Sequence, residues 1–146
     1  MKVFSNLRNL QILSVVLSAI GLADSLYLWW TKISQTSIIC GVGDCDLVNA
    51  SPYSSLLGVP VAAIGAAGYG ALLVAALWAL IARDDAPPWL TNARLVLASG
   101  GLFFAAYLTG IEAFILHAYC IWCVLQAAAM LGIFVGLWME RRVENA

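Results

Sequence analysis

Four long apolar stretches are the feature of this sequence that most restricts its fold. They cover about residues 10–30, 56–82, 95–118 and 120–139, and crossing a hydrocarbon core takes about 20 apolar residues. Of the 146 residues, 63% are hydrophobic and only 10% are charged, whereas a soluble domain is about 45–50% apolar and about 25% charged. We therefore expect an all-α fold, an integral membrane four-helix bundle in a lipid bilayer, formed as a single transmembrane domain by residues 1–146.

The three connections between these spans differ in length. Residues 83–88 combine charges with two prolines, which end a helix, and the last two spans meet in a tight turn at residues 117–120. The long connection, residues 31–55, is rich in the turn formers glycine, aspartate and asparagine. Within it, Ser51-Pro52 is typical of a helix N-cap followed by proline, and predicts a short surface helix or the start of the second span.

The positions of the basic residues predict the orientation in the membrane, because cytoplasmic loops are enriched in lysine and arginine. With a cytoplasmic N-terminus, the outer side receives only Lys32, and the cytoplasmic side receives six residues: Lys2, Arg8, Arg83, Arg94, Arg141 and Arg142. We therefore expect a multi-pass protein of the plasma (inner) membrane. Both termini would be cytoplasmic, and the long loop and all four cysteines extracytoplasmic.

There is no basic patch of the kind that nucleic acid requires.

The pair Cys120-Ile-Trp-Cys123 opens the last span, where free N–H groups and the helix dipole stabilise a thiolate. Residues i and i+3 share a helix face, so the two sulfurs can form a bond. At 1.5 Å per residue, Cys123 lies about 4–5 Å deeper in the membrane than Cys120. A lipid-soluble oxidant is therefore expected to reach Cys123, and an aqueous or loop thiol to reach Cys120.

The second pair, Cys40 and Cys45, flanks the sequence Gly-Val-Gly-Asp in the long loop. Thiol–disulfide exchange needs a movable sulfur, so the two pairs predict a relay from a soluble dithiol through the loop to Cys120 and from Cys123 to a quinone. Two inert structural disulfides are an alternative. Zinc binding by four cysteines is a further one, but it suits neither a membrane helix start nor an oxidising compartment, and we expect no metal.

Four other residues are candidates for the site. Asp24 and Glu112 are ionisable groups inside spans, and such groups are functional suspects by default. Both fall in the outer half, where they would deliver protons or shape a pocket, unless they only snorkel to the interface or make interhelical hydrogen bonds. His117 would donate a proton to a quinone oxygen or lie idle in the interface, and Trp122 would pack on a quinone ring.

The order of these motifs resembles the vitamin K epoxide reductase family, especially its bacterial homologues. The resemblance covers roughly residues 10 to 140. It rests on the loop pair, on Ser51 six residues after Cys45, on Gly58-Val59-Pro60, and on the Cys-x-x-Cys that opens the last span; Ser25-Leu26-Tyr27 and Tyr107-Leu108 are also similar to the family.

The resemblance implies a four-helix bundle around a quinone pocket near the outer surface. It implies that Cys123 attacks the quinone, with Cys120 as its disulfide partner. Cys45 would exchange with Cys120, Cys40 would meet the external partner, and Ser51 would lie by the pocket. Many bacterial homologues carry a fused thioredoxin-like domain that is not found before Ala146, so the expected partner is a separate extracytoplasmic thioredoxin-like protein.

The expected function is that of a membrane thiol–quinone oxidoreductase. It would oxidise a thioredoxin-like protein dithiol and reduce a membrane quinone of the menaquinone, ubiquinone or vitamin K type, supporting disulfide-bond formation. One alternative makes reduction of vitamin K quinone or its epoxide the main activity. Animal enzymes of the family have a pocket tyrosine four residues beyond the Cys-x-x-Cys, where this chain has Ala127. Another alternative is a non-catalytic tetraspan protein with structural disulfides.

Overall fold

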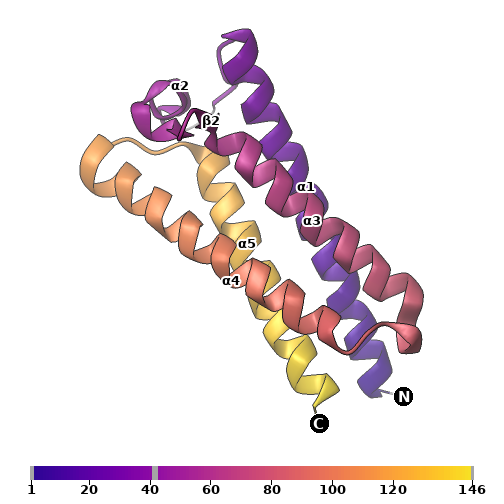
Figure 1. The fold of residues 1–146 in the computed structure, drawn as a ribbon. Helices are drawn as coiled ribbons and strands as arrows, with labels where there is room; N and C mark the ends of the chain where they lie inside the picture. The colour runs from indigo at the N-terminus through magenta and orange to yellow at the C-terminus, as the bar shows by residue number, and fades with distance from the viewer. Residues whose placement is uncertain (1, 41–42, 146) are drawn as a thin grey trace.

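Four long helices form a bundle in the computed structural model, which describes residues 2–40 and 43–145 (Figure 1). Each helix is long and apolar enough to cross a membrane, which confirms the expected all-α four-helix membrane fold. The helices are α1 (Lys2–Ser34), α3 (Val61–Ala82), α4 (Trp89–Ile111) and α5 (Ile121–Glu144); the 3₁₀ turn η2 (Arg83–Asp85) follows α3, and the π-helical turn η3 (Glu112–Leu116) extends α4.

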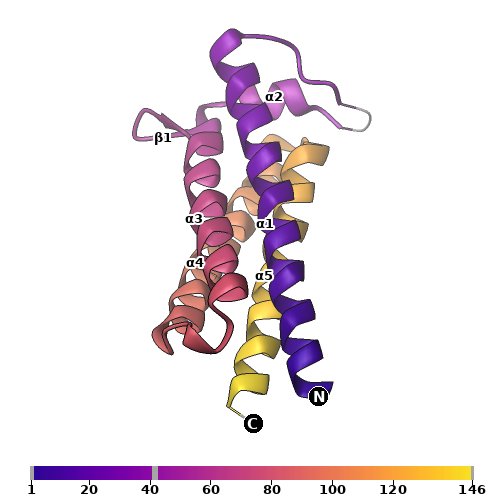
Figure 2. The ribbon, with the colours of Figure 1, turned by 90° about the vertical axis from the view of Figure 1, so that its right-hand side faces the viewer.

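The packing of the four helices is uneven. α1 packs along both α3 and α5, and α4 packs along α5, whereas α3 and α4 contact each other less extensively. Both ends of the chain lie at one end of the bundle, and the long loop lies at the other end beside the turn from η3 to α5 (Figures 1 and 2). Residues near 40 and near 120 are thereby brought together.

Small residues allow α1 to approach its neighbours closely. Ser14, Ser18 and Ser25 are buried on one stripe of α1, and a Cβ atom on Gly21 of the same stripe would overlap the ring of Tyr69 on α3. Close backbone approach through small residues is typical of membrane helix pairs. The central core cluster consists of Tyr69, Leu72, Leu95, Ala98, Ala129, Met130, Ile133 and Leu137.

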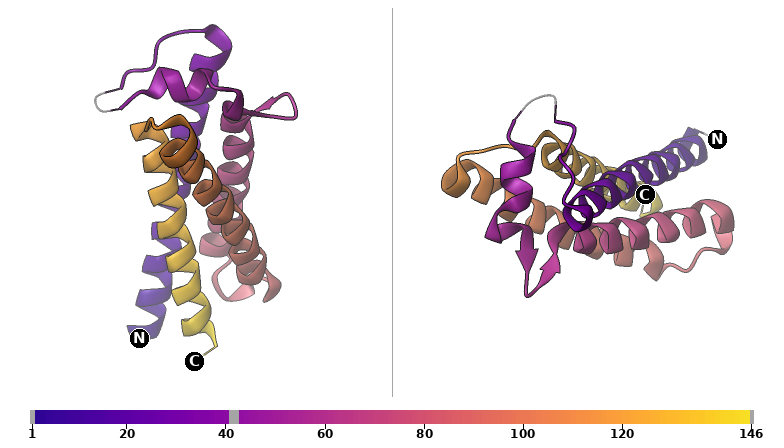
Figure 3. Two further views of the ribbon diagram at one scale, coloured as in Figure 1. Left: turned by 90° about the vertical axis from the view of Figure 1, so that its left-hand side faces the viewer. Right: turned by 90° about the horizontal axis from the view of Figure 1, so that it is seen from above.

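The long connection between α1 and α3 lies across the end of the bundle (Figure 3). It contains the short helix α2 (Cys45–Ala50), the 3₁₀ turn η1 (Pro52–Ser54) and a hairpin of β1 (Ser55–Leu56) and β2 (Val59–Pro60). The expected short surface helix after Ser51 is η1. The Ser51 hydroxyl, however, donates to the Val48 carbonyl at 2.7 Å instead of capping η1.

The second membrane helix begins at Val61, later than the predicted start at about Leu56. Leu57 (φ 53°) and Gly58 (φ 83°) adopt left-handed conformations that turn the chain back as a hairpin. Pro60 then holds the residue before it extended, so the helix starts only after the proline. The opposite shift occurs at α4, which begins directly after Pro88 because proline is well tolerated at a helix start.

A buried ion pair joins two helices at the end of the bundle that carries the termini. Arg94 of α4 is 2% exposed and Glu140 of α5 is 0% exposed, and their Nη1 and Oε1 atoms are 2.9 Å apart. Gln11 of α1 donates to the same Oε1 at 3.5 Å. Arg94, which the sequence assigned to the cytoplasmic side, is therefore buried between helices at the end of the bundle that carries the termini.

Replacement of Glu140 tests the contribution of this pair. Glu140→Leu leaves the Arg94 guanidinium buried without its partner, and removing one member of a buried pair costs about 3–5 kcal/mol. Thermal unfolding in detergent, followed by circular dichroism, should therefore show a clearly lower midpoint. The double variant Arg94→Met/Glu140→Leu should recover most of the loss because no charge stays buried; an equally unstable double variant would contradict this account.

Candidate functional site

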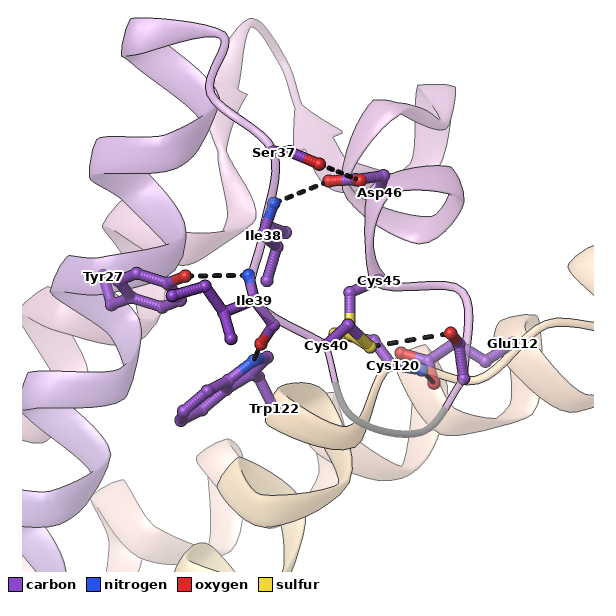
Figure 4. Close-up of a disulfide and its surroundings, with 11 residues drawn as sticks. Tyr27, Ser37, Ile38, Ile39, Cys40, Cys45, Asp46, Glu112, Cys120 and Trp122 are labelled. Atoms are coloured by element: carbon purple, nitrogen blue, oxygen red, sulfur yellow. Dashed lines mark hydrogen bonds between the residues drawn. A yellow bond between two sulfur atoms is a disulfide. The ribbon is translucent and has the colours of Figure 1, made fainter.

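All four cysteines lie in or beside α2 and the start of α5, at the end of the bundle remote from the termini (Figure 1). Figure 4 shows Cys40, Cys45 and Cys120 close together there. Cys40 and Cys45 form a disulfide at the start of α2, and Cys120 and Cys123 are free thiols. Cys120 is the N-cap residue of α5, with extended backbone angles, and Cys123 lies in the first turn of that helix. Two cysteine pairs far apart in the sequence therefore meet, one oxidised and one reduced.

A backbone contact fixes the loop pair against the start of α5. The Asp44 N–H donates to the Tyr119 carbonyl at 2.7 Å, and Gly43 pairs antiparallel with Cys120. Gly43 has a φ of +99°, and a Cβ atom there would collide with the Tyr119 carbonyl oxygen, so this position requires glycine.

The sulfur-bearing residues on the two sides of this contact are shielded from solvent. Cys45 and Cys120 are each 1% exposed, whereas Cys40 is only half-buried. Cys45 and Cys120 belong to one apolar cluster, whose other buried members are Leu28, Ile38, Val48, Ala62 and Ala118. This arrangement suits thiol–disulfide exchange between Cys45 and Cys120, because the two residues lie in the same cluster and both are shielded from water.

A buried carboxyl group lies beside the reduced pair. Glu112 is 4% exposed at the first position of the π-helical turn η3, and π-helical turns are frequent at functional sites. The Cys120 N–H points to Glu112 Oε2 at 3.5 Å, and the Cys123 thiol is within hydrogen-bonding range of the same carboxyl group. Glu112, Cys120 and Cys123 therefore lie together, at the cysteine end of the bundle where the sequence placed Glu112.

The electrostatics of the reduced pair favour a thiolate at Cys120. The Cys123 thiol donates a hydrogen bond to the Cys120 sulfur and lowers the pKa of Cys120 from its usual 9.0 to about 7, although burial opposes the shift. Backbone N–H groups of Trp122 and Cys123 at the helix N-terminus act in the same direction. The Cys120 thiol can consequently ionise near neutral pH.

A cavity of about 290 Å³ opens below the long loop, between α3, α4 and α5. Its volume is at the lower end of the roughly 300–1,000 Å³ usual for small-molecule sites. Most of its wall is apolar, including Leu72, Leu97, Phe104, Leu108 and Met130. The groups that carry chemistry gather near the loop end and are Ser51, Glu112, Cys120, Cys123 and Gln126.

Small residues keep this cavity open. Gly68 of α3 and Gly100 of α4 both line it, and a Cβ atom on either would meet no other side chain or distant backbone within 4 Å. Ala127 also lines it, at the position four residues beyond the Cys-x-x-Cys. The space thus exists because α3 and α4 present little side-chain volume where they face each other.

Two residues predicted for a quinone site do not line the cavity. Trp122 faces the long loop, where its Nε1 donates to the Ile39 carbonyl at 2.7 Å, because two adjacent positions on a helix point in different directions. His117 ends η3 in a left-handed conformation (φ 51°) and is exposed. The cavity is therefore lined by Ser51 and Glu112 of the predicted quinone contacts, but not by Trp122 or His117.

Asp24, the other ionisable group predicted inside a span, is buried in α1 with 5% exposure. Neither of its carboxyl oxygens has a hydrogen-bond partner among the described residues, so it does not make the interhelical hydrogen bond considered as an alternative. It does not line the cavity, but it interacts electrostatically with Cys120 and Tyr69.

A polar network that forms part of the cavity wall, through Tyr69 and Gln126, was not predicted. The Tyr69 hydroxyl donates to the Gln126 carbonyl at 2.5 Å, and Gln126 Nε2 donates to Ser25 Oγ at 3.0 Å. This network links α1, α3 and α5 directly behind Cys123. The available signal was Gln126 itself, the only strongly polar side chain of the last predicted span, placed three residues after Cys123 and hence on the same helix face.

The match to known protein families decides the identity of the chain. The model of the vitamin K epoxide reductase family matches residues 12–138, which is most of the sequence. The chain belongs to the vitamin K epoxide reductase family. The resemblance inferred from the cysteine motifs is thereby confirmed, and the matched region includes both cysteine pairs and every residue of the cavity.

Membership in this family makes the chain a multi-pass membrane oxidoreductase with quinone-related redox chemistry. The cavity and the two cysteine pairs are the features of the fold on which such chemistry can act. Among residues 2–40 and 43–145, no three His, Cys, Asp or Glu side chains gather as a metal site would require.

Titration of the Cys120 thiol tests the hydrogen bond that it accepts from Cys123. In a Cys40→Ala/Cys45→Ala background, the ultraviolet absorbance of the thiolate should rise as the pH increases through about 7. Removing the donor with Cys123→Ala should move this midpoint upward, toward the usual 9.0 of a thiol. Cys120→Ala supplies the baseline, and an unchanged midpoint in Cys123→Ala would show that Cys123 does not stabilise the thiolate.

Proposed function

We propose that this protein oxidises the dithiol of a separate thioredoxin-like protein and reduces a membrane quinone, and so supports disulfide-bond formation. One observation carries the proposal: the free pair Cys120 and Cys123 lines an apolar cavity, while the loop disulfide lies against Cys120 on the other side. A loop pair that a soluble partner can reach at the half-buried Cys40, next to a pair that lines a cavity, is what a two-stage relay needs. Purely structural disulfides would not require a free dithiol at a cavity.

In the proposed route, two electrons pass inward through two successive thiol–disulfide exchanges and then reach the quinone. The partner dithiol reduces the Cys40–Cys45 disulfide, with Cys40 as the point of attack because it is less buried than Cys45. The loop dithiol then reduces a Cys120–Cys123 disulfide, starting from Cys45. Finally, two electrons and two protons pass to the quinone as the bond between the Cys120 and Cys123 sulfurs forms again.

The cavity suits the ring of a quinone with its tail between α3 and α4. Its chemical groups are at the loop end, and its apolar part extends along both helices as far as Leu72 and Leu97. In this pose Cys123 is the reacting sulfur, and Ser51 and Glu112 contact the ring or its oxygens. Glu112 also contacts the Cys123 thiol, so a proton has a short path from sulfur to carboxyl group.

We further propose that the cysteine end of the bundle is extracytoplasmic and that the protein resides in the plasma membrane. Arg8, Arg141 and Arg142 lie exposed at the end that carries the termini, as the enrichment of basic residues in cytoplasmic segments favours. At the cysteine end, Lys32 is held by the Asn49 carbonyl at 3.1 Å and by the Ser54 hydroxyl. An oxidising compartment on that side also suits the loop disulfide.

An anaerobic quinone-reduction assay tests the proposed roles of the four cysteines. Wild-type protein should form quinol from a water-soluble quinone and a reduced thioredoxin-like protein, and Cys123→Ala should abolish turnover because the reacting sulfur is lost. Cys40→Ala should lose turnover with the protein dithiol. Full activity of Cys123→Ala would disprove the assigned reacting sulfur, and no quinol from the wild type would disprove the proposed function.

Filling the cavity tests the quinone site separately from the thiol chemistry. Gly68→Leu should raise the KM for quinone about tenfold, which equals about 1.4 kcal/mol of binding free energy, because the new side chain occupies the space of the ring or tail. Gly110→Leu is the matched control, since Gly110 also has open space at its Cβ but does not line the cavity. Equal KM values in the two variants would place the quinone elsewhere.

A further inference from the structure

Two aromatic side chains hold the backbone of Ile39, the residue just before Cys40. The Ile39 N–H donates to the Tyr27 hydroxyl at 3.0 Å, and the Ile39 carbonyl accepts from Trp122 Nε1 at 2.7 Å (Figure 4). The rings of Tyr27 and Trp122 touch, with centroids 5.3 Å apart. The backbone N–H and the backbone carbonyl of this one residue are therefore both held by side chains of two membrane helices.

The preceding residues are held from the loop itself. Asp46, one residue after Cys45, accepts hydrogen bonds from the Ile38 N–H at 2.9 Å and from the Ser37 hydroxyl at 2.7 Å. These bonds lower the pKa of Asp46, chiefly through the Ile38 N–H, so the carboxylate stays ionised as an acceptor. The segment before Cys40 is thus tied to the segment after Cys45 and, through Ile39, to α1 and α5.

We propose that Trp122 and Tyr27 are positioning residues for electron transfer between the two cysteine pairs. Trp122 lies between Cys120 and Cys123 in the sequence. The start of α5 therefore carries both the reacting thiols and the indole N–H that donates to the loop backbone. The bond from Trp122 holds the backbone next to Cys40 close to the turn of α5 that begins at Cys120. This inference rests on the proposed relay and assigns Trp122 to the loop step, not to the quinone.

The step that these residues support is a disulfide exchange of balanced stoichiometry. The Cys45 thiolate attacks the Cys120 sulfur of the Cys120–Cys123 disulfide, and Cys123 leaves as a thiolate. The Cys40 thiolate then attacks the Cys45 sulfur, and Cys120 leaves. Two electrons and two protons have moved from the loop pair to the α5 pair. Each attack requires the incoming sulfur to line up with the bond it breaks, which a fixed loop backbone favours.

A single-turnover experiment on the full-length protein separates this step from quinone reduction. Fully reduced enzyme holds four thiols, so mixing it anaerobically with excess water-soluble quinone should give two quinols in two phases. The first phase draws electrons from Cys120 and Cys123, and the second appears only after the loop pair has reduced them again. Cys40→Ala/Cys45→Ala should show the first phase alone, which assigns the two phases.

Trp122→Phe and Tyr27→Phe each remove one hydrogen bond to Ile39 and keep the aromatic ring. We expect each variant to slow the second phase about fivefold, in line with the loss of one hydrogen bond, and to leave the first phase unchanged. Trp30→Phe, at an exposed site on the same end of α1, should change neither phase. The first phase thereby reports within each trace that the variant is folded.

Failure of the positioning role and failure of the proposed relay would give different results in this experiment. An unchanged second phase in both variants, or equal slowing of both phases, would overturn the positioning role. Absence of the first phase in the wild type would instead overturn the proposed function. A slower second phase beside a normal first phase supports both.

Discussion

The contact between the long loop and the turn before α5 is the interaction on which the rest of the site depends. It consists of the Asp44–Tyr119 hydrogen bond and the pairing of Gly43 with Cys120. A loop joining two membrane helices has many conformations open to it, and fixing each residue costs about 1–2 kcal/mol in entropy. Backbone pairing at this point, with glycine where a side chain would collide, holds the loop pair against the start of α5. The proposed relay depends on this contact, because it brings the two cysteine pairs together.

The cavity reflects a compromise between stability and function in the bundle. α1 packs tightly against α3 and α5 through small residues, and the network of Tyr69, Gln126 and Ser25 secures these three helices behind Cys123. α4 is instead secured at the far end by the buried Arg94–Glu140 pair. Near the cysteines it is free to lie apart from α3, with Gly68 and Gly100 across the gap. The cavity thus lies between the two neighbouring helices that contact each other least extensively, α3 and α4.

The sequence predicted the four helices, the shared location of the cysteine pairs and the family, because hydropathy and the Cys-x-x-Cys motif are local signals. It could not predict what depends on the rotation of helices about their axes. Trp122 and Cys123 are neighbours in the sequence, yet one faces the loop and the other the cavity. The partner of Arg94 lies on another helix, and the hairpin before Val61 arises from the left-handed Leu57 and Gly58. Leu57 gives no sequence signal for such a conformation.

Helix geometry also determines where the two residues between the cysteines of the Cys-x-x-Cys turn point. Successive residues of an α-helix are rotated by about 100°, so when Cys120 and Cys123 share a face, the two residues between them point elsewhere. In this chain one of those positions is an indole whose N–H reaches the backbone next to Cys40. The two cysteines of the motif therefore line the cavity, while its tryptophan faces the loop. This placement of Trp122 fits the positioning role proposed for it rather than the quinone contact that the sequence suggested.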